Sequence, residues 1–488
     1  YEISLGLVGS EMCIRDRGQM NYSSIARNTM IAFAAQFISL SVSVVMSLLV
    51  PKIVGVADYG YWQLFMFYTT YSGFFHLGLN DGVYLINGGL SREEIDKSSI
   101  KSQYILGACF QALICLVITL VSMPLVDDAN RVFVIASFAL YTVVYNLTSY
   151  LGFVFQAMNE TKLFSFSTML DRLVFLAPLL VLIGLKVSDY HPYVYAYLVS
   201  KIIALIYCSW MGRDILRAKS MSFCNALKDG IHSIVVGVKL MIANIADTLI
   251  LGVSRFLIDH FWGIVAFAKI SFSLSLVNFF ITFVSQASMV LFPALRTGSD
   301  EERVRFYIGI RNAIELIFPA IFLLYFPMVW ILGAWLPQYS ESLRYFALLL
   351  PICVFNTKMS LCCTTYFKVL RKEQLLLKLN IVAVICSTVF SVFGVLALDS
   401  LDAVLCGAVI CIIGRSLWSE LYLNERLSAP GSSRPFQEIL LTVAFVLFTE
   451  LMPGGVAALL YSIVYIGYLL LNHSELKNVA SHLSRLKH

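Results

Sequence analysis

The chain has 488 residues, of which 59% are hydrophobic and only 13% charged; its mean hydropathy is +0.80 and its formal net charge is +5. Soluble domains carry about 25% charged residues, so this composition excludes an ordinary soluble protein and indicates that a lipid bilayer surrounds most of the chain. The cysteines are scattered, without CxxC or Cys/His spacing. This pattern argues against a disulfide framework and against a metal site.

The first 19 residues differ from the rest of the chain. The stretch YEISLGLVGSEMCIRDR (1–17) resembles translated sequencing-adapter read-through. It has neither the long apolar core nor the small-residue cleavage site of a signal peptide. We therefore predict that residues 1–19 are a non-native, adapter-derived segment and that the native chain begins at Met20.

Long apolar runs recur from Met30 almost to the C-terminus. A helix needs about 20 apolar residues to cross a hydrocarbon core about 30 Å thick, and these runs are too long and continuous for the alternating strands of an outer-membrane barrel. They predict an all-α polytopic membrane protein with about fourteen transmembrane helices; the last two runs are short and adjacent, so twelve or thirteen is the alternative. The predicted spans are 30–51, 62–85, 103–126, 132–156, 166–186, 192–212, 234–254, 262–290, 308–335, 343–367, 375–398, 402–422, 436–452 and 455–472.

Lys and Arg are concentrated in alternate connections between these spans. The connection after the sixth span, for example, contains Arg213, Arg217 and Lys219, whereas the connections on the opposite side are short and acidic, as at Asp127-Asp128. Positively charged connections stay in the cytoplasm. The asymmetry therefore predicts that both termini are cytoplasmic.

The two halves of the chain resemble each other weakly but in order. Tyr104 and Pro124 recur as Tyr307 and Pro327 at one common offset, and the stretch FQAMNETKLF matches FKVLRKEQLL in the second half. Units with an even number of helices face the same way, so the pattern predicts a parallel repeat of two six-helix lobes with the substrate between them. The predicted parts are an N-terminal lobe over 20–213, a C-terminal lobe over 233–424, two extra transmembrane helices over 435–472 and a cytoplasmic tail over 473–488.

Four lysines are predicted to lie well inside spans: Lys201, Lys239, Lys269 and Lys358. A charge at the bilayer centre costs about 2.5–3.5 kcal/mol on insertion scales, so such residues normally face a cavity or a partner. Together they predict a cationic cavity for an anionic substrate, because lysine offers a mobile point charge to a phosphate or pyrophosphate group. The alternative is that each lysine pairs locally or extends to the membrane interface.

Two further ionisable residues are candidates for ion coupling. Asp247 is the acidic residue that lies most clearly inside a span, and a salt bridge is its alternative role. His76 lies with Asn80 and Asp81 in the later half of the second span, where glycines permit close helix approach. It is either a protonation site or a packing histidine.

The sequence contains no indication of an enzymatic activity, including ATP hydrolysis to drive transport. No GxxxxGK[ST] stretch is present, and the connections are too short for a folded catalytic domain. We therefore expect neither catalytic residues nor a bound cofactor, and ATP hydrolysis within this chain is excluded.

One stretch, residues 51–89, is more specific: PKIVGVADYGYWQLFMFYTTYSGFFHLGLNDGVYLINGG. Its Asp58-Tyr59-Gly60 triplet, the aromatic-rich helix that follows and the sequence GLNDG at 78–82 resemble the same region of bacterial oligosaccharide flippases. These proteins form the polysaccharide-transporter branch of the MATE-like (MOP) superfamily. The rest of the chain agrees with them in architecture rather than in motifs.

This resemblance implies a function. A family member would move undecaprenyl-pyrophosphate-linked oligosaccharide units, such as those of O-antigen in lipopolysaccharide, from the cytoplasmic to the outer leaflet of the bacterial inner membrane. It would work by alternating access, driven by a proton or sodium gradient. The partners it implies are the lipid-linked oligosaccharide, membrane lipids and other polysaccharide-assembly proteins, without nucleic acid.

Three other functions stay open. A lipid II flippase of the same fold would carry a related cationic cavity. A MATE-type drug or ion antiporter should prefer acidic cavity residues, whereas bases outnumber acids deep inside the predicted spans. A membrane glycan polymerase or ligase would be an enzyme acting on the same lipid-linked substrate, but such enzymes usually present a large outer loop, and the outer connections here are short turns.

Overall fold

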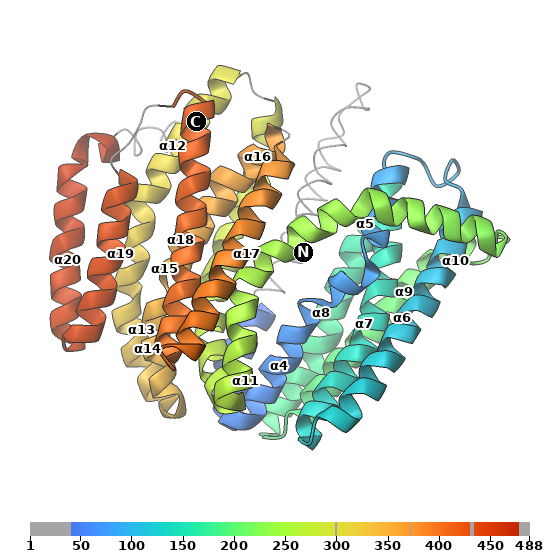
Figure 1. Cartoon of the computed structure of the whole chain (residues 1–488), viewed down its shortest axis with the longest axis horizontal. Coiled ribbons are helices and arrows are strands. Elements are labelled where there is room, and N and C mark those ends of the chain that lie inside the picture. The colour runs from blue at the N-terminus through green and yellow to red at the C-terminus, as the bar shows by residue number, and fades with distance from the viewer. Residues whose placement is uncertain (1–40, 298–299, 371, 430–433, 478–488) are drawn as a thin grey trace. The chain divides into compact units, whose positions relative to one another are not determined.

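The computed structural model describes residues 41–297, 300–370, 372–429 and 434–477, and every regular element in these ranges is a helix (Figure 1). Ten helical stretches among them are long and apolar enough to cross a membrane. The predicted all-α polytopic fold is therefore confirmed. The predicted segment 1–19, the first half of the first span (30–40) and the end of the tail lie outside the described residues.

The chain divides into two compact units, Tyr1–Thr248 and Leu249–His488. The helices of the first unit are α3 (Val50–Ile53), α4 (Val56–Thr69), the 3₁₀ helix η1 (Ser72–His76), α5 (Leu79–Asn87), α6 (Lys97–Leu125), α7 (Ala129–Ala157), α8 (Thr161–Gly184), α9 (His191–Met211) and α10 (Arg213–Leu216). Helix α11 (Phe223–Thr297) begins in the first unit and continues into the second. The division thus falls inside α11, beyond the predicted lobe borders at 213 and 233.

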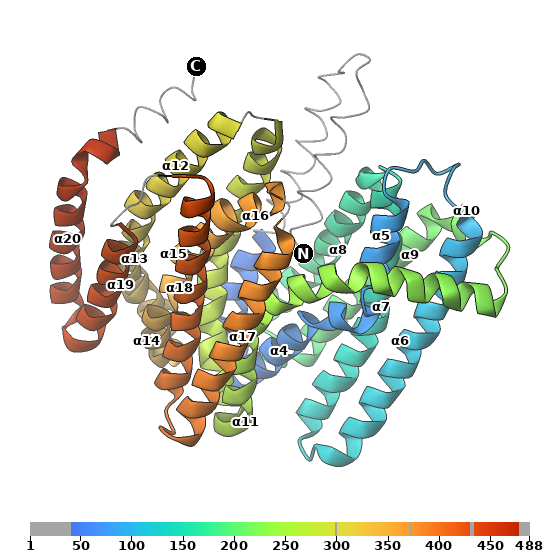
Figure 2. The ribbon, with the colours of Figure 1, turned by 45° about the horizontal axis from the view of Figure 1, so that its top comes forward.

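The second unit contains the remaining elements. They are α12 (Asp300–Ile317), η2 (Phe318–Ala320), α13 (Ile321–Trp335), η3 (Pro337–Tyr339), α14 (Ser340–Leu349), α15 (Pro351–Lys358), the π-helix η4 (Met359–Thr364), α16 (Thr365–Val369), α17 (Glu373–Leu396), α18 (Leu401–Arg426), α19 (Arg434–Leu451) and α20 (Gly454–Leu471). The two predicted extra helices correspond to α19 and α20, which lie side by side in both ribbon views (Figures 1 and 2). They pack on α13 and α14 and so belong to this unit.

Several predicted spans differ in detail from the ten apolar stretches. The second span is interrupted between α4 and α5. The seventh and eighth spans share one apolar stretch, Phe223–Thr282, inside which Gly263 departs from helical geometry with a φ of 77°. Helix α19, the thirteenth span, carries Glu438 and Glu450, which lower its hydropathy.

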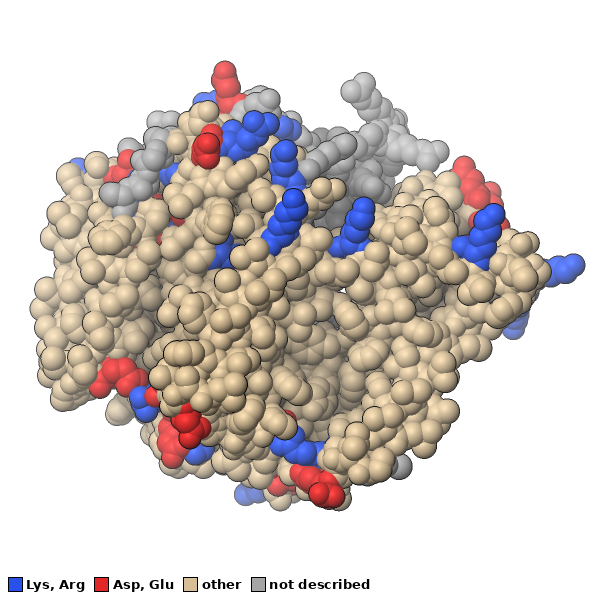
Figure 3. All heavy atoms as spheres, viewed as in Figure 1, with Lys and Arg blue, Asp and Glu red and all other residues tan. Residues whose placement is uncertain are grey.

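Charged side chains gather near the ends of the helices in each unit, and the middles of the helices are apolar (Figure 3). Leu113, Leu116 and Leu120 of α6 are each more than half exposed. A soluble protein rarely exposes such a continuous apolar face. The protein is therefore a multi-pass membrane protein whose outer helix faces contact lipid.

Aromatic side chains fill the first unit between α4, α7, α8 and α9. Trp62 is almost fully buried; its ring stacks on Phe175 at a centroid distance of 6.2 Å and meets the edge of Tyr197 at 5.9 Å. Phe65 also meets the Tyr197 ring edge-on, at 5.9 Å. Such pairs stabilise by about 0.5–1.5 kcal/mol beyond their burial. The aromatic-rich stretch that follows Asp58 thus forms part of the core of this unit.

Arg92 ties three connections together at one end of the first unit. Its guanidinium lies 2.8 Å from Asp214 and 2.7 Å from Glu160, and Lys97 lies 2.8 Å from Asp214. Partial burial alone would raise the pKa of Asp214, but the hydrogen bond from Lys97 and the charge of Arg92 hold that pKa below its usual range. These connections lie outside the spans, where ion pairs meet water.

Tyrosines of α20 attach the C-terminal pair of helices to a break between α12 and α13. Pro319 has no N–H, so the carbonyl of Glu315 loses the donor that an unbroken helix would supply. The Tyr468 hydroxyl donates to that carbonyl instead. In all, three hydrogen bonds join Tyr461, Tyr465 and Tyr468 to the carbonyl oxygens of Pro319, Leu316 and Glu315, at 3.0, 2.9 and 3.0 Å.

Replacing Tyr468 by Phe should remove one of these bonds while the ring stays packed. We expect the free energy of unfolding to fall by about 1–3 kcal/mol, because the buried Glu315 carbonyl would be left without its donor. Thermal unfolding in detergent measures the change. Tyr195→Phe is the control, since Tyr195 is 55% exposed; equal shifts in both variants would contradict the expected role of Tyr468.

Candidate functional site

The second predicted span is interrupted in its middle. Helix α4 ends at Thr69, η1 occupies Ser72–His76, and α5 begins at Leu79. Between them Leu77 and Gly78 have left-handed backbone angles, with φ of 53° and 91°. Leucine rarely adopts this conformation, because its Cβ crowds the following carbonyl oxygen. Strain of this kind is concentrated at functional sites.

Side-chain amides of α6 and α7 donate hydrogen bonds to backbone carbonyls of this interruption. Asn146 Nδ2 donates to the Ser72 carbonyl at 3.0 Å, and Gln111 Nε2 donates to the Phe75 carbonyl at 2.8 Å. Asn146 Nδ2 also donates to Gln111 Oε1 at 3.0 Å, so the two amides form one network. Non-helical backbone is tolerated at membrane depth only where protein groups or a cavity satisfy it.

A cavity of about 230 Å³ lies beside this network. Its most polar lining residues are His76, Asn80, Gln103, Gln111 and Asn146, and the rest of its wall comes mainly from apolar side chains of α5, α6, α7 and the first part of α11. Asn146 Oδ1 is buried and has no hydrogen-bond partner. Asn80 Nδ2 donates to the Asn146 carbonyl at 3.2 Å, which ties α5 to α7. The cavity is therefore mainly apolar, with a few polar side chains on its wall.

His76 is held in one orientation beside a carboxylate. Its Nδ1 accepts a hydrogen bond from the Gly78 N–H at 3.0 Å, so the neutral ring carries its proton on Nε2. That Nε2 lies 3.8 Å from Asp81 Oδ2, and the two side chains are 9% and 6% exposed. The candidate protonation site thus has a buried carboxylate as its neighbour on the first turn of α5.

Helix α5 crosses the first part of α11 with their backbones in contact. A Cβ added to Gly82 would lie 1.8 Å from the Ser233 carbonyl oxygen, and one added to Gly237 would lie 2.1 Å from the Gly78 carbonyl oxygen. The close helix approach expected from the glycines of the second span is present at Gly78 and Gly82. The interruption is therefore in direct contact with the helix that continues into the second unit.

Lys201, on α9, lies among the aromatic side chains of the first unit. Its Nζ is 2.5 Å from Asp171 Oδ2 and 4.9 Å from the centroid of the Tyr197 ring. Ser200 Oγ also donates to Asp171, at 2.9 Å. The charge of Lys201 is thus balanced locally, as in the alternative to a cationic cavity.

Lys358, at the end of α15, is fully buried among three carboxylates. Its Nζ lies 2.9 Å from Glu420 and 3.8 Å from Glu315, and it also contacts Glu438; all four side chains are 0% exposed. The carboxylates come from α18, α12 and α19. Lys358 therefore joins the C-terminal pair of helices to the rest of the second unit.

The remaining predicted site residues have different surroundings. Lys269 forms an ion pair with Glu341, whose side chain is 68% exposed. Lys239 and Asp247, both on α11, are exposed, and Asp247 is not among the residues that line the cavity beside His76. The structure thus brings His76 and Asp81 together, and it places each paired lysine with a carboxylate of its own. The cationic cavity and the role of Asp247 stay predictions.

Sequence analysis did not single out Gln111, Asn146 or Glu438. Gln111 and Asn146 are amides inside otherwise apolar runs, so their polarity at membrane depth is the signal that could have found them. Glu438 lies close to the start of the thirteenth span, where a solvated position is the simpler expectation from sequence.

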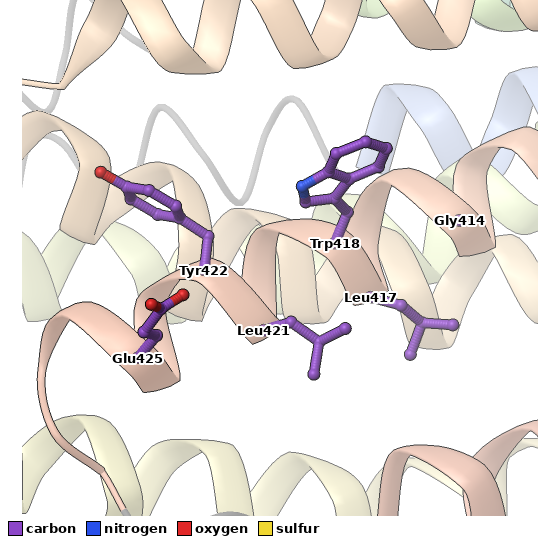
Figure 4. A pocket seen from close by; sticks show the side chains of 6 residues that line it. All are labelled: Gly414, Leu417, Trp418, Leu421, Tyr422 and Glu425. Atoms are coloured by element: carbon purple, nitrogen blue, oxygen red, sulfur yellow. The ribbon is translucent and has the colours of Figure 1, made fainter.

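A second hollow, of about 380 Å³, lies on the surface of α18 (Figure 4). It is lined by Gly414, Leu417, Trp418, Leu421, Tyr422 and Glu425, all from this one helix. Trp418 and Leu421 are 64% and 63% exposed. A hollow on one exposed helix encloses no ligand, so the interruption in the second span remains the candidate site.

One family model and several solved structures match this chain. Residues 25–299 match the model of a family described as polysaccharide biosynthesis protein. No curated protein matches the chain in sequence.

Solved structures share the fold. The lipid II flippase MurJ in an inward closed conformation aligns with 92% of this chain and 99% of its own, at a TM-score of 0.60 and 11% identity. An inward-facing multidrug resistance MATE family transporter of the MOP superfamily aligns with 82% of this chain and 98% of its own, at a TM-score of 0.56 and 14% identity. A mutant of the Vibrio cholerae MATE transporter VcmN aligns with 89% of this chain and 99% of its own, at a TM-score of 0.54 and 14% identity.

The family model spans more than half of the chain, and the structural likeness extends over nearly all of it. The chain therefore belongs to the polysaccharide biosynthesis protein family and has the fold of MOP-superfamily transporters.

Proposed function

We propose that this protein is a flippase that moves undecaprenyl-pyrophosphate-linked oligosaccharide units from the cytoplasmic to the outer leaflet of the bacterial inner membrane. The observation that carries this proposal is the match to the polysaccharide biosynthesis family over residues 25–299. The transporter fold supports movement of a substrate rather than its chemical conversion. Alternating access would be driven by an ion gradient, with both termini in the cytoplasm.

The cargo has two parts that require different surroundings. Its polyprenyl chain is apolar and can stay in lipid, whereas its sugars and pyrophosphate need polar contacts on the way across. Three of the four candidate lysines already have carboxylate partners: Lys201, Lys269 and Lys358. Lys239 is exposed on α11. Within the cationic-cavity hypothesis, Lys239 is therefore the first residue to test for contact with the pyrophosphate.

The test is flipping of lipid-linked oligosaccharide in proteoliposomes, read out by accessibility of the glycan in the outer leaflet. We expect the parent protein to transport and Lys239→Ala to reduce its apparent affinity for substrate about tenfold or more, since a hydrogen bond between charged groups contributes about 1.5–3 kcal/mol. Lys228→Ala is the matched control, because Lys228 is also exposed and lies on the same helix outside the predicted span.

Other outcomes would redirect the proposal. Transport of lipid II alone would identify a lipid II flippase. Extrusion of a small cation or drug, with no movement of any isoprenoid-linked glycan, would indicate an antiporter. Elongation of the glycan in the assay would indicate a polymerase or ligase.

A further inference from the structure

The hydrogen bond between Gly78 and His76 depends on the charge of the histidine. A neutral imidazole accepts at one nitrogen and donates from the other, whereas an imidazolium donates from both. His76 Nδ1 accepts the Gly78 N–H at 3.0 Å. This bond can therefore exist only while His76 is neutral, and it closes the left-handed turn at Leu77 and Gly78.

We propose that His76, with Asp81 as its counter-ion, is the site that takes up the coupling proton, and that uptake opens the turn at Leu77 and Gly78. The proposal rests on the proposed transport function and names its coupling ion. His76 lines the cavity, through which the proton would reach it, and Asp81 lies 3.8 Å from Nε2. The proton adds to Nδ1, no covalent bond between heavy atoms changes, and the same proton is released when the turn closes again.

Burial favours one proton on this pair. Neutral His76 beside an ionised Asp81 leaves one uncompensated negative charge in a nearly enclosed site, and an uncompensated charge is costly in low dielectric. One added proton removes the net charge, either as an ion pair when it binds His76 or as two neutral groups when it binds Asp81; only the first breaks the bond from Gly78. Imidazole is the side chain whose charge changes most readily near neutral pH.

Apart from Asp81, the ionisable groups around His76 do not compete for this proton. From α6 and α7 the cavity receives the phenols of Tyr104 and Tyr150, which stay protonated at neutral pH. The first part of α11 lines it with Leu227, Gly230, Ile231 and Ile234. Lys239, the nearest charged residue in sequence to the contact between Gly78 and Val238, is exposed.

A proton fits this site better than a sodium ion. Sodium would need several free oxygen ligands, whereas the site offers Asn146 Oδ1 and the Asp81 carboxylate. The carbonyls of Ser72 and Phe75 already accept hydrogen bonds from Asn146 and Gln111. The His76 Nε2–H also faces Asp81, where a metal ion would have to lie.

The turn has a direct route to the rest of the molecule. A Cβ on Gly78 would lie 2.5 Å from the Val238 amide nitrogen, so the turn and α11 are packed backbone to backbone. Opening the turn must therefore shift α11, which runs on across the border between the units at Thr248. Proton uptake would thereby shift the part of α11 that precedes the break at Gly263.

Three variants distinguish the effect of proton uptake from the effect of a disturbed fold. His76→Asn keeps an acceptor for the Gly78 N–H, because an Asn side chain readily bonds the backbone two residues on, but it cannot take up a proton. Asp81→Asn removes the counter-ion with little change of shape. His191→Asn is the matched control, since His191 pairs with the exposed Asp189 outside the spans.

The first experiment is hydrogen exchange of the segment 77–82 in the full chain, measured against pH without substrate. We expect acidification to reduce protection of this segment in the parent and in His191→Asn, and this acid-dependent loss to be absent in His76→Asn. Equal protection of parent and His76→Asn at every pH would overturn the proposal, whether or not the protein is a flippase.

The second experiment adds an imposed pH gradient to the flipping assay. A gradient should accelerate flipping by the parent and by His191→Asn, and the acceleration should be lost in His76→Asn and in Asp81→Asn. Flipping driven by sodium and indifferent to the pH gradient would overturn the proton site and leave the flippase standing. Absence of flipping with any lipid-linked oligosaccharide would refute the proposed function, while the exchange experiment still decides whether His76 binds the proton.

Discussion

Lys358→Met is expected to lower the free energy of unfolding by about 3–5 kcal/mol, the usual result of removing one partner from a buried ion pair. Lys358 contacts Glu315, Glu420 and Glu438 inside the second unit, where all four side chains are fully buried; Glu315 also lies 3.7 Å from Arg434, so Glu420 and Glu438 depend most on the lysine. Methionine fills a similar volume, so the loss would arise from the uncompensated carboxylates rather than from a cavity. Denaturant or thermal unfolding in detergent measures it.

The matched control is Lys269→Met. Lys269 also pairs with a glutamate, but Glu341 is 68% exposed, and an exposed pair contributes only about 0–1 kcal/mol. A double variant, Lys358→Met with Glu438→Gln, should recover part of the loss, since removing both partners leaves less unpaired charge. Equal effects of Lys358→Met and Lys269→Met would show that the buried cluster does not hold α19 in place.

This result also bears on the cationic-cavity hypothesis. A transport defect in a Lys358 variant would arise from loss of the fold, because Lys358 has no exposed surface with which to meet a substrate. Only a variant that folds like the parent can report on the substrate path. Lys239 satisfies this condition better, since its side chain is exposed.

The sequence predicts the membrane fold well because long apolar runs leave one physical solution, the spanning helix. It also predicts close approach at Gly78 and Gly82, because glycines in a span let backbones meet. It does not predict the left-handed turn at Leu77, since leucine has no local preference for that conformation. Asn146 and Gln111, from two other helices, supply donors to the backbone just before the turn, and these distant partners cannot be identified from the local sequence.

The sequence also does not predict the ion-pair partners of the buried lysines. Lys358 meets Glu420 and Glu438 across 62 and 80 residues of chain. An isolated lysine in a span looks the same whether it faces a cavity or a carboxylate from a distant helix. The Lys201 pair with Asp171 has the same explanation, with 30 residues between the partners. Sequence thus identifies which residues need a partner, and only packing identifies the partner.

Gly82→Ala should be the most disruptive small substitution in the first unit. The added Cβ would lie 1.8 Å from the Ser233 carbonyl oxygen, so α5 and α11 would have to separate. Overpacking commonly costs about 1–3 kcal/mol and more where backbone must move. The gain of about 1 kcal/mol from replacing glycine by alanine in a helix does not offset this. Gly184→Ala is the control, because no atom lies within 4 Å of a Cβ at that position.

A rescue experiment sharpens this prediction. If the clash were with a side chain, trimming Ser233 to alanine would relieve it; because the clash is with the Ser233 carbonyl oxygen, Gly82→Ala with Ser233→Ala should be as unstable as Gly82→Ala alone, or more so. Thermal unfolding of the three proteins in detergent decides. Recovery in the double variant would show that the added methyl group meets the Ser233 side chain and not its carbonyl oxygen, and the direct backbone contact between α5 and α11 would then be refuted.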